Sequence, residues 1–145
     1  MYILHNQFIK CLNDIYKHCQ SNTIIANEFC KIFLLLVVNC NVLIISCYSI
    51  DNEPAIHCHK DCLTILLQII KSCHESEETI QLCSQILRVI AFGEPALLYN
   101  SSTFFAYLEL IFNLYPRSTT ILLHLFCCLL HLIRNRGNSY FHSFQ

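Results

Sequence analysis

The segment EETIQLCSQILRVIAFG, residues 77–93, decides the fold class of this chain of 145 residues. Its apolar side chains recur at intervals of three and four residues, which predicts a helix with an apolar face. They are Ile80, Cys83, Ile86, Leu87 and Ile90. Glu77 and Glu78 stand at its start, where the helix dipole favours carboxylates. Gly93 follows its end, as a capping glycine does, and Pro95 prevents simple continuation.

The same order of helix, break and helix occurs again along the chain. Two helices are predicted before the break at Gly93, at residues 61–73 and 77–92. Two more are predicted after it, at residues 103–115 and 118–134. Thr79-Ile80 corresponds to Thr120-Ile121 at a shift of 41 residues. Tyr115-Pro116 closes the third of these helices, because a residue before proline avoids the helical region. The sequence therefore predicts a repeated helical unit.

A third copy of the unit precedes these two. Its helices are predicted at 6–19 and 22–39, and Thr23-Ile24 lies at the matching place with a shift of 56 residues. Extra residues near 42–54 account for the longer shift. Repetition with a period of about 40–47 residues and two or three helices per unit is typical of armadillo and HEAT arrays. The alternative is a generic helical bundle, but helix order, breaks and apolar faces recur together.

We therefore predict an all-α fold, an armadillo/HEAT-like right-handed helical solenoid of about three repeats that is a fragment of a longer protein. The predicted units are residues 1–40, 41–92 and 93–135, with a break at Asn135 to Asn138 and the start of a further unit at 136–145. Terminal repeats normally need polar caps, and neither end of the chain has one. We therefore expect adjacent repeats of a longer chain to cover the ends.

Composition narrows the function classes. Hydrophobic residues make up 54% of the chain and charged residues 13%, which excludes intrinsic disorder. The formal net charge is −1, and the most basic corner, at Arg117, Arg134 and Arg136, is too small for nucleic-acid binding. No phosphate-cradling glycine loop and no nucleophile signature is present, so we expect a non-enzymatic protein without a cofactor.

Eleven cysteines raise the question of the redox compartment. The start of the chain, Met1 to His5, has no basic segment followed by an apolar one, so no signal peptide is visible. Most of the cysteines fall within predicted helices, where a thiol acts as a small hydrophobe. We therefore expect a reducing compartment, the cytoplasm, and mostly buried thiols.

The apolar stretch IFLLLVVNCNVLIISCYSI, residues 32–50, supports an alternative. A membrane-spanning helix needs about 20 apolar residues, and this stretch has no formal charge. Asn39 and Asn41 interrupt it, and an asparagine near the centre of a bilayer is costly. A small membrane-associated protein that uses residues 32–50 is thus the second hypothesis, after a soluble chain with a buried helix.

Residues 77–91 resemble the long third helix of an armadillo repeat, residues 94–99 its short first helix and residues 104–115 its second helix. The block YLELIFNLYP, residues 107–116, is similar to a member of that family that acts in cilium and sperm-flagellum assembly. The resemblance implies a non-enzymatic scaffold or adaptor that binds protein partners, in the cytoplasm or in the cilium or flagellum. The chain has no tryptophan, so importin-like capture of a basic peptide does not fit.

The resemblance also implies that the third helices line a concave binding face. Residues spaced i, i+4 and i+7 share one side of a helix. At matching positions of this chain they give the candidate partner-binding residues Glu28, Gln81, Gln85, Arg88, His124, Cys128 and His131. The alternative is that these residues are only the exposed polar stripe of amphipathic helices.

A metal site has one weak candidate. Cys58, His59 and Cys62 have the residue types that bind zinc, but a closed tetrahedral site needs four ligands. Cys73-His74 lies a full helix away. The alternative is a polar loop that leads into a helix at Asp61, with Cys62 buried, and we therefore predict no metal.

Overall fold

The computed structural model describes residues 2–18, 20–46 and 53–143, and within these ranges all regular secondary structure is α-helical. This confirms the predicted all-α class. The helices are α1 (Tyr2–His18), α2 (Thr23–Ser46), α3 (Glu53–Cys73), α4 (Glu77–Gly93), α5 (Pro95–Tyr99), α6 (Ser102–Leu114) and α7 (Thr119–Ser143).

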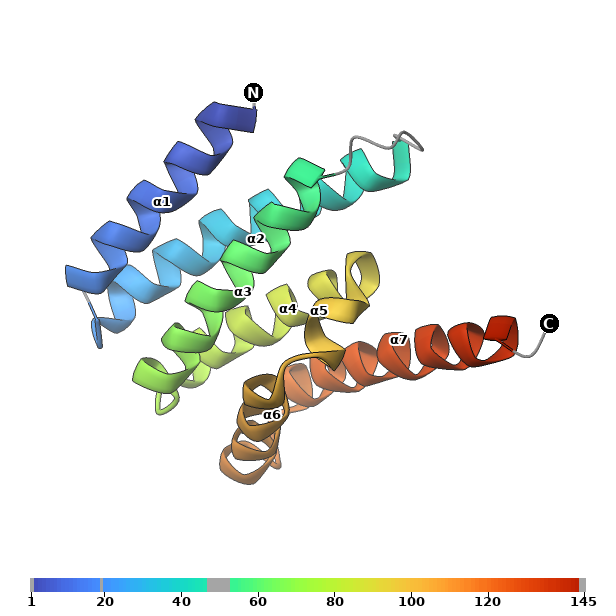
Figure 1. Ribbon diagram of the computed structural model, residues 1–145. Coiled ribbons are helices and arrows are strands. Elements are labelled where there is room, and N and C mark those ends of the chain that lie inside the picture. Colours follow the sequence, from blue (N-terminus) through green and yellow to red (C-terminus); the bar gives the residue numbers. More distant parts are fainter. Residues whose placement is uncertain (1, 19, 47–52, 144–145) are drawn as a thin grey trace.

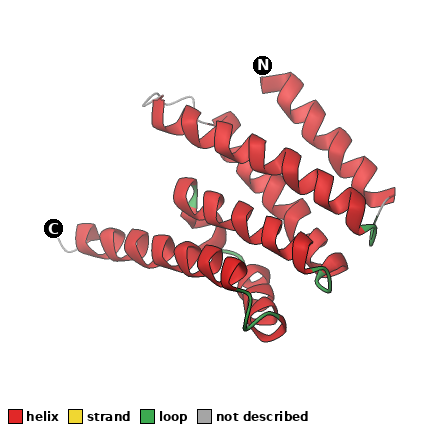
Figure 2. Ribbon diagram, turned by 180° about the vertical axis from the view of Figure 1, so that it is seen from behind, coloured by secondary structure: helices red, strands yellow, loops and turns green. Residues whose placement is uncertain are grey.

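The helices form two layers. In one layer α4 lies between α2 and α7 and contacts both, and Figure 2 shows these three helices as successive rows. In the other layer α3 lies between α1 and α6 (Figure 1). The short helix α5 contacts α4 and α7. The three helices α2, α4 and α7 run in the same direction along the chain (Figure 1).

Polar residues cap the starts of several helices. The Asn22 side chain accepts hydrogen bonds from the backbone N–H groups of Ile24 (3.1 Å) and Ile25 (3.2 Å) at the start of α2. At the start of α4, the Ser76 hydroxyl accepts a hydrogen bond from the backbone N–H of Thr79. At the start of α6, the Ser101 hydroxyl accepts a hydrogen bond from a backbone N–H of that helix. These bonds satisfy backbone donors that have no partner inside a helix.

Several predicted helix ends are wrong. α2 continues past residue 40 to Ser46, and α3 begins at Glu53, well before Asp61. α7 continues through the predicted break at 135–138 to Ser143, so the expected start of a further unit at 136 lies inside a helix. Asparagine and a single glycine lower helix propensity by only about 1 kcal/mol or less each, which does not stop a helix.

Gly93 is also placed differently from the prediction. It is the last residue of α4, and no glycine in the described part of the chain has a positive φ. Glu94 ends the helix instead, and its N–H donates to the carbonyl of Ile90 at 2.7 Å. Pro95 then occupies the first turn of α5, where its missing N–H costs nothing.

The core is built from a repeated set of buried residues. Each of α2, α4 and α7 buries four residues at i, i+4, i+7 and i+11, which share one side of a helix. These sets are Ala26, Cys30, Phe33 and Val37; Ile80, Ser84, Leu87 and Ala91; and Ile121, Leu125, Cys128 and Leu132. The last two sets are 41 residues apart, as predicted, whereas the first two are 54 apart and not 56.

α4 is buried on a second side as well. Thr79, Cys83, Ile86 and Ile90 are all fully buried, and two of them contact α2 directly. The Thr79 hydroxyl donates to Oδ1 of Asn27 at 2.6 Å, and the Sγ atoms of Cys83 and Cys30 lie 3.7 Å apart. α4 is therefore the central helix of the structure.

The apolar stretch at 32–50 lies mostly in α2. Among the helices that the structure describes, none combines the length and the apolarity that crossing a membrane requires. Residues 47–50 of the stretch lie outside the described part of the chain.

The central position of α4 leads to a test with matched isoleucines. Ile90→Ala should lower the free energy of unfolding by about 2–5 kcal/mol, because Ile90 is fully buried. Ile24→Ala is the control, since Ile24 is 75% exposed, and its effect should stay within about 0.5 kcal/mol. Urea denaturation measures both. Similar losses for the two variants would contradict the burial of α4.

Candidate interaction surface

Two predicted site residues meet where α4 packs against α7. Nη1 of Arg88 lies 3.4 Å from Nδ1 of His124, and both side chains are partly buried. A guanidinium only donates hydrogen bonds, so Nδ1 of His124 accepts. The imidazole is then neutral and carries its proton on Nε2. Burial lowers the pKa of His124 from its ordinary value, and the positive charge of Arg88 lowers this pKa further.

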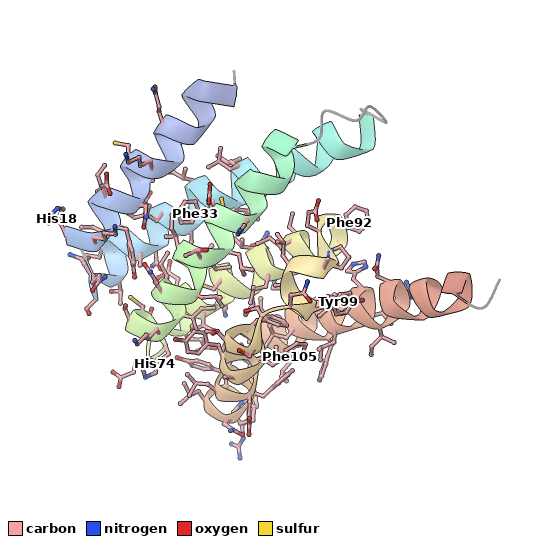
Figure 3. All side chains as sticks on the ribbon, viewed as in Figure 1. His18, Phe33, His74, Phe92, Tyr99 and Phe105 are labelled. Atoms are coloured by element: carbon pink, nitrogen blue, oxygen red, sulfur yellow. The ribbon has the colours of Figure 1, made fainter. Side chains whose placement is uncertain are left out.

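His131 also lies at this interface. Its ring packs edge-on against Phe92 of α4, with the ring centroids 5.4 Å apart and an interplanar angle of 73°. Figure 3 labels Phe92 at the end of α4. Arg88, His124 and His131 therefore belong to one continuous contact between α4 and α7.

Gln81 and Gln85 complete the polar part of α4. Both are partly exposed, and they share one side of the helix with Arg88 because the three are spaced i, i+4 and i+7. We call Gln81, Gln85, Arg88, His124 and His131 the polar row. The structure thus brings Arg88, His124 and His131 into one contact between helices, and the spacing along α4 places Gln81 and Gln85 on the side of Arg88.

Glu28 lies on α2, outside the polar row. Its carboxylate pairs with Nζ of Lys31 at 2.9 Å, and both side chains are more than half exposed. This carboxylate, first by hydrogen bond and then by charge, raises the pKa of Lys31. An exposed ion pair of this kind contributes little to stability. Glu28 is therefore accessible, but its charge is already partly neutralised.

Cys128 is not a surface residue. Its side chain is fully buried, and its Sγ lies 3.7 Å from the carbonyl oxygen of Leu87 in α4. Burial, with a smaller contribution from Cys127, raises the pKa of the Cys128 thiol to about 12. The i+4 spacing from His124 predicts a shared side of the helix, but that side turns into the core at this position. Cys128 consequently cannot contact a partner in the folded chain.

Most described thiols are buried, as the sequence predicts. Of the seven cysteines whose side chains the structure describes, five are buried: Cys30, Cys62, Cys73, Cys83 and Cys128. Burial is the main reason why the pKa values of Cys73 and Cys83 are raised. The thiols of Cys73 and Cys83 therefore stay protonated at neutral pH, and all five buried cysteines act as small core residues.

The weak metal candidate gains no support from the structure. Cys58, His59 and Cys62 belong to α3 and not to a loop, and Cys62 is fully buried. The side chains of Cys58 and His59 lie outside the described residues. In the described part of the chain, no three histidine, cysteine, aspartate or glutamate side chains gather in a way that would hold a metal ion.

A small open hollow of about 280 Å³ lies away from the polar row. Glu77 at the start of α4 and Arg117 in the turn between α6 and α7 are among the residues that line it. The Tyr115 hydroxyl, at the same turn, donates to the carbonyl of His74 at 2.5 Å, which ties this turn to the end of α3. The hollow therefore lies where the start of α4 meets the turn between α6 and α7.

One surface was missed by the sequence analysis. α7 exposes four large apolar side chains on one side: Leu123, Phe126, Leu130 and Ile133. The available signal was that residues 121–133 are apolar on more than one side of the helix. The sequence alone does not tell which side of such a helix is left uncovered.

No protein-family model matches the chain, and neither the search of curated proteins nor that of solved structures gives a significant match. The resemblance of residues 77–91 to an armadillo helix therefore stays a prediction. Geometry is the basis on which a function can be argued.

The contact between Arg88 and His124 can be tested by titration. Arg88→Gln should raise the pKa of His124, because it removes the positive charge that disfavours the imidazolium ion. Arg117→Gln, which changes an exposed arginine in the turn before α7, should leave the pKa of His124 unchanged. NMR titration of the imidazole signals measures both. An unchanged pKa of His124 in Arg88→Gln would refute the contact.

The same histidine should make stability depend on pH. Its pKa is lower in the folded chain than the ordinary value of 6.5, so the unfolded chain binds the proton first as the pH falls. The free energy of unfolding should therefore decrease as the pH falls through 6.5. Between about pH 7.5 and about pH 5.5, the Tm should fall less in His124→Gln than in the unmodified chain. His18→Gln, at an exposed site, should keep the whole decrease.

Proposed function

We propose that the chain is an armadillo/HEAT-like right-handed solenoid whose polar row binds a protein partner. The layer of α2, α4 and α7 and the layer of α1, α3 and α6 support this proposal, since each layer adds one helix per unit. The recurring set of four buried residues supports it as well. Stacked units of this kind present extended surfaces that serve for binding.

The contact between Arg88 and His124 is the observation that carries the proposal. Two successive units each contribute a partly buried polar side chain to one place. Among the described residues, the ion pairs are Lys17–Asp14 and Lys31–Glu28, so the guanidinium of Arg88 has no carboxylate partner there. A partly desolvated arginine beside exposed apolar rings is typical of the residues that dominate protein interfaces.

The proposed role is that of a non-enzymatic scaffold or adaptor, and its mechanism is the presentation of a rigid surface. Adjacent repeats of a longer chain and a protein partner are the expected binding companions. Action in the cytoplasm and in cilium or sperm-flagellum assembly is proposed on the resemblance of residues 107–116 alone. No nucleic acid, membrane or cofactor is part of the proposal.

Site-specific photo-crosslinking tests the polar row. A benzoylphenylalanine in place of Gln85 should crosslink a defined protein in an extract of cells that express the chain. The same replacement of Gln68, an exposed glutamine of α3 in the other layer, should not. An excess of unlabelled chain should compete for the crosslink, whereas the Arg88→Glu variant should compete at least about tenfold less well, as expected for an interface arginine.

This comparison is valid only when the Tm of Arg88→Glu stays close to that of the unmodified chain. If Arg88→Glu lowers the Tm, Arg88→Gln replaces it as the competitor. Equal crosslinking from positions 85 and 68, or equal competition by the variant, would show that the polar row does not bind the partner.

A further inference from the structure

The exposed apolar side of α7 takes no part in the proposed binding by the polar row. Leu123, Phe126, Leu130 and Ile133 are spaced so that they share one side of the helix, and they are 55%, 57%, 44% and 68% exposed. We call these four residues the apolar stripe. Leaving large apolar side chains in water forgoes roughly 1–2 kcal/mol each, so a contiguous stripe indicates a covered surface.

The internal repeat indicates which kind of element covers such a stripe, because the equivalent side of α4 has a known neighbour. At the shift of 41 residues that relates the cores of α4 and α7, the stripe corresponds to Leu82, Gln85, Val89 and Phe92 of α4. Leu82 and Val89 are only partly exposed and pack against the core. This side of α4 is the side that meets α7, as the contacts of Arg88 with His124 and of Phe92 with His131 show.

The stripe is more apolar than its counterpart in α4. Phe126 stands where α4 has Gln85, and Leu129 stands where α4 has Arg88. The ring of Phe126 packs against Phe112 of α6, with centroids 5.7 Å apart, so the apolar surface extends onto the second helix of the unit. The stripe of α7 thus occupies the positions that α4 uses to contact α7. Because its side chains are more apolar, the hydrophobic driving force for covering it is stronger.

We propose that the apolar stripe binds a helix of a further helical unit, which lies parallel to α7 as α7 lies parallel to α4. The helix that fits has small or apolar residues at i, i+4, i+7 and i+11, the spacing that α2, α4 and α7 each turn into the core. The stripe is then the next position in the row of α2, α4 and α7 (Figure 2).

A second copy of this chain fits the stripe less well. Head-to-tail stacking would place the outward side of α2 on the stripe. That side exposes Ile24 and Leu35, but the ion pair of Glu28 with Lys31 lies between them. Burying this pair would cost the desolvation of two charges. The stripe therefore favours a separate unit whose inner side carries no charge.

The proposal can be tested on the full chain with a defined helical probe. The probe is a synthetic peptide of residues 119–135 with both cysteines replaced by alanine and a nitroxide at its N-terminus, because this segment carries the required spacing. Peptide binding should shift the methyl NMR signals of Leu123, Leu130 and Ile133. In a parallel arrangement, the nitroxide should broaden the signals of Leu123 more than those of Ile133.

Two variants control the experiment. Leu130→Gln should weaken peptide binding about tenfold or more, the loss expected when a buried leucine becomes polar. Leu35→Gln, which changes a leucine that is 67% exposed on α2, should bind the peptide like the unmodified chain. Because both leucines are exposed, neither change should alter the Tm by more than about 2 °C.

Three outcomes would overturn the proposal. They are the absence of methyl shifts at saturating peptide, stronger broadening of Ile133 than of Leu123, and a dimer in sedimentation experiments that Leu130→Gln dissociates. The last would assign the stripe to a second copy. None of these outcomes bears on the polar row, because its α7 members His124 and His131 lie on another side of α7 than the stripe, and the row is tested by crosslinking.

Discussion

The packing of α4 between α2 and α7 is the interaction on which the rest of the structure depends. α4 buries two adjacent sides and makes close contacts with both α2 and α7. Because interiors are closely packed, the small side chains of Thr79, Cys83 and Ser84 let the helices approach where larger ones would separate them.

This packing explains where the two surfaces lie. Some residues of α4 point neither to α2 nor into the core, and these contact α7. Arg88 contacts His124 there, and Phe92 contacts His131. The polar row lies there, partly buried. One helix further on, the equivalent side of α7 stays exposed apart from the contact of Phe126 with Phe112 of α6, and it forms the apolar stripe. The same structural position is thus a polar edge in one unit and an uncovered apolar surface in the next.

Local signals predicted much of the fold. The carboxylates at the start of α4, Pro95, and the end of α6 before Pro116 are correct because they depend on backbone chemistry within a few residues. The shift of 41 residues is correct because it relates two cores with the same spacing. Predictions from Gly93 and from Asn135 failed, since a weak helix former does not end a helix that packing stabilises.

The sequence by itself determined the helical class, the 41-residue shift between α4 and α7 and the mostly buried thiols, because these depend on spacing along single helices. Tertiary structure alone decided the register of α2, the burial of Cys128, the contact between Arg88 and His124, and which apolar side of α7 stays exposed. The physical reason is that periodicity determines which residues share a side of a helix, whereas only the neighbouring helices determine whether that side is covered.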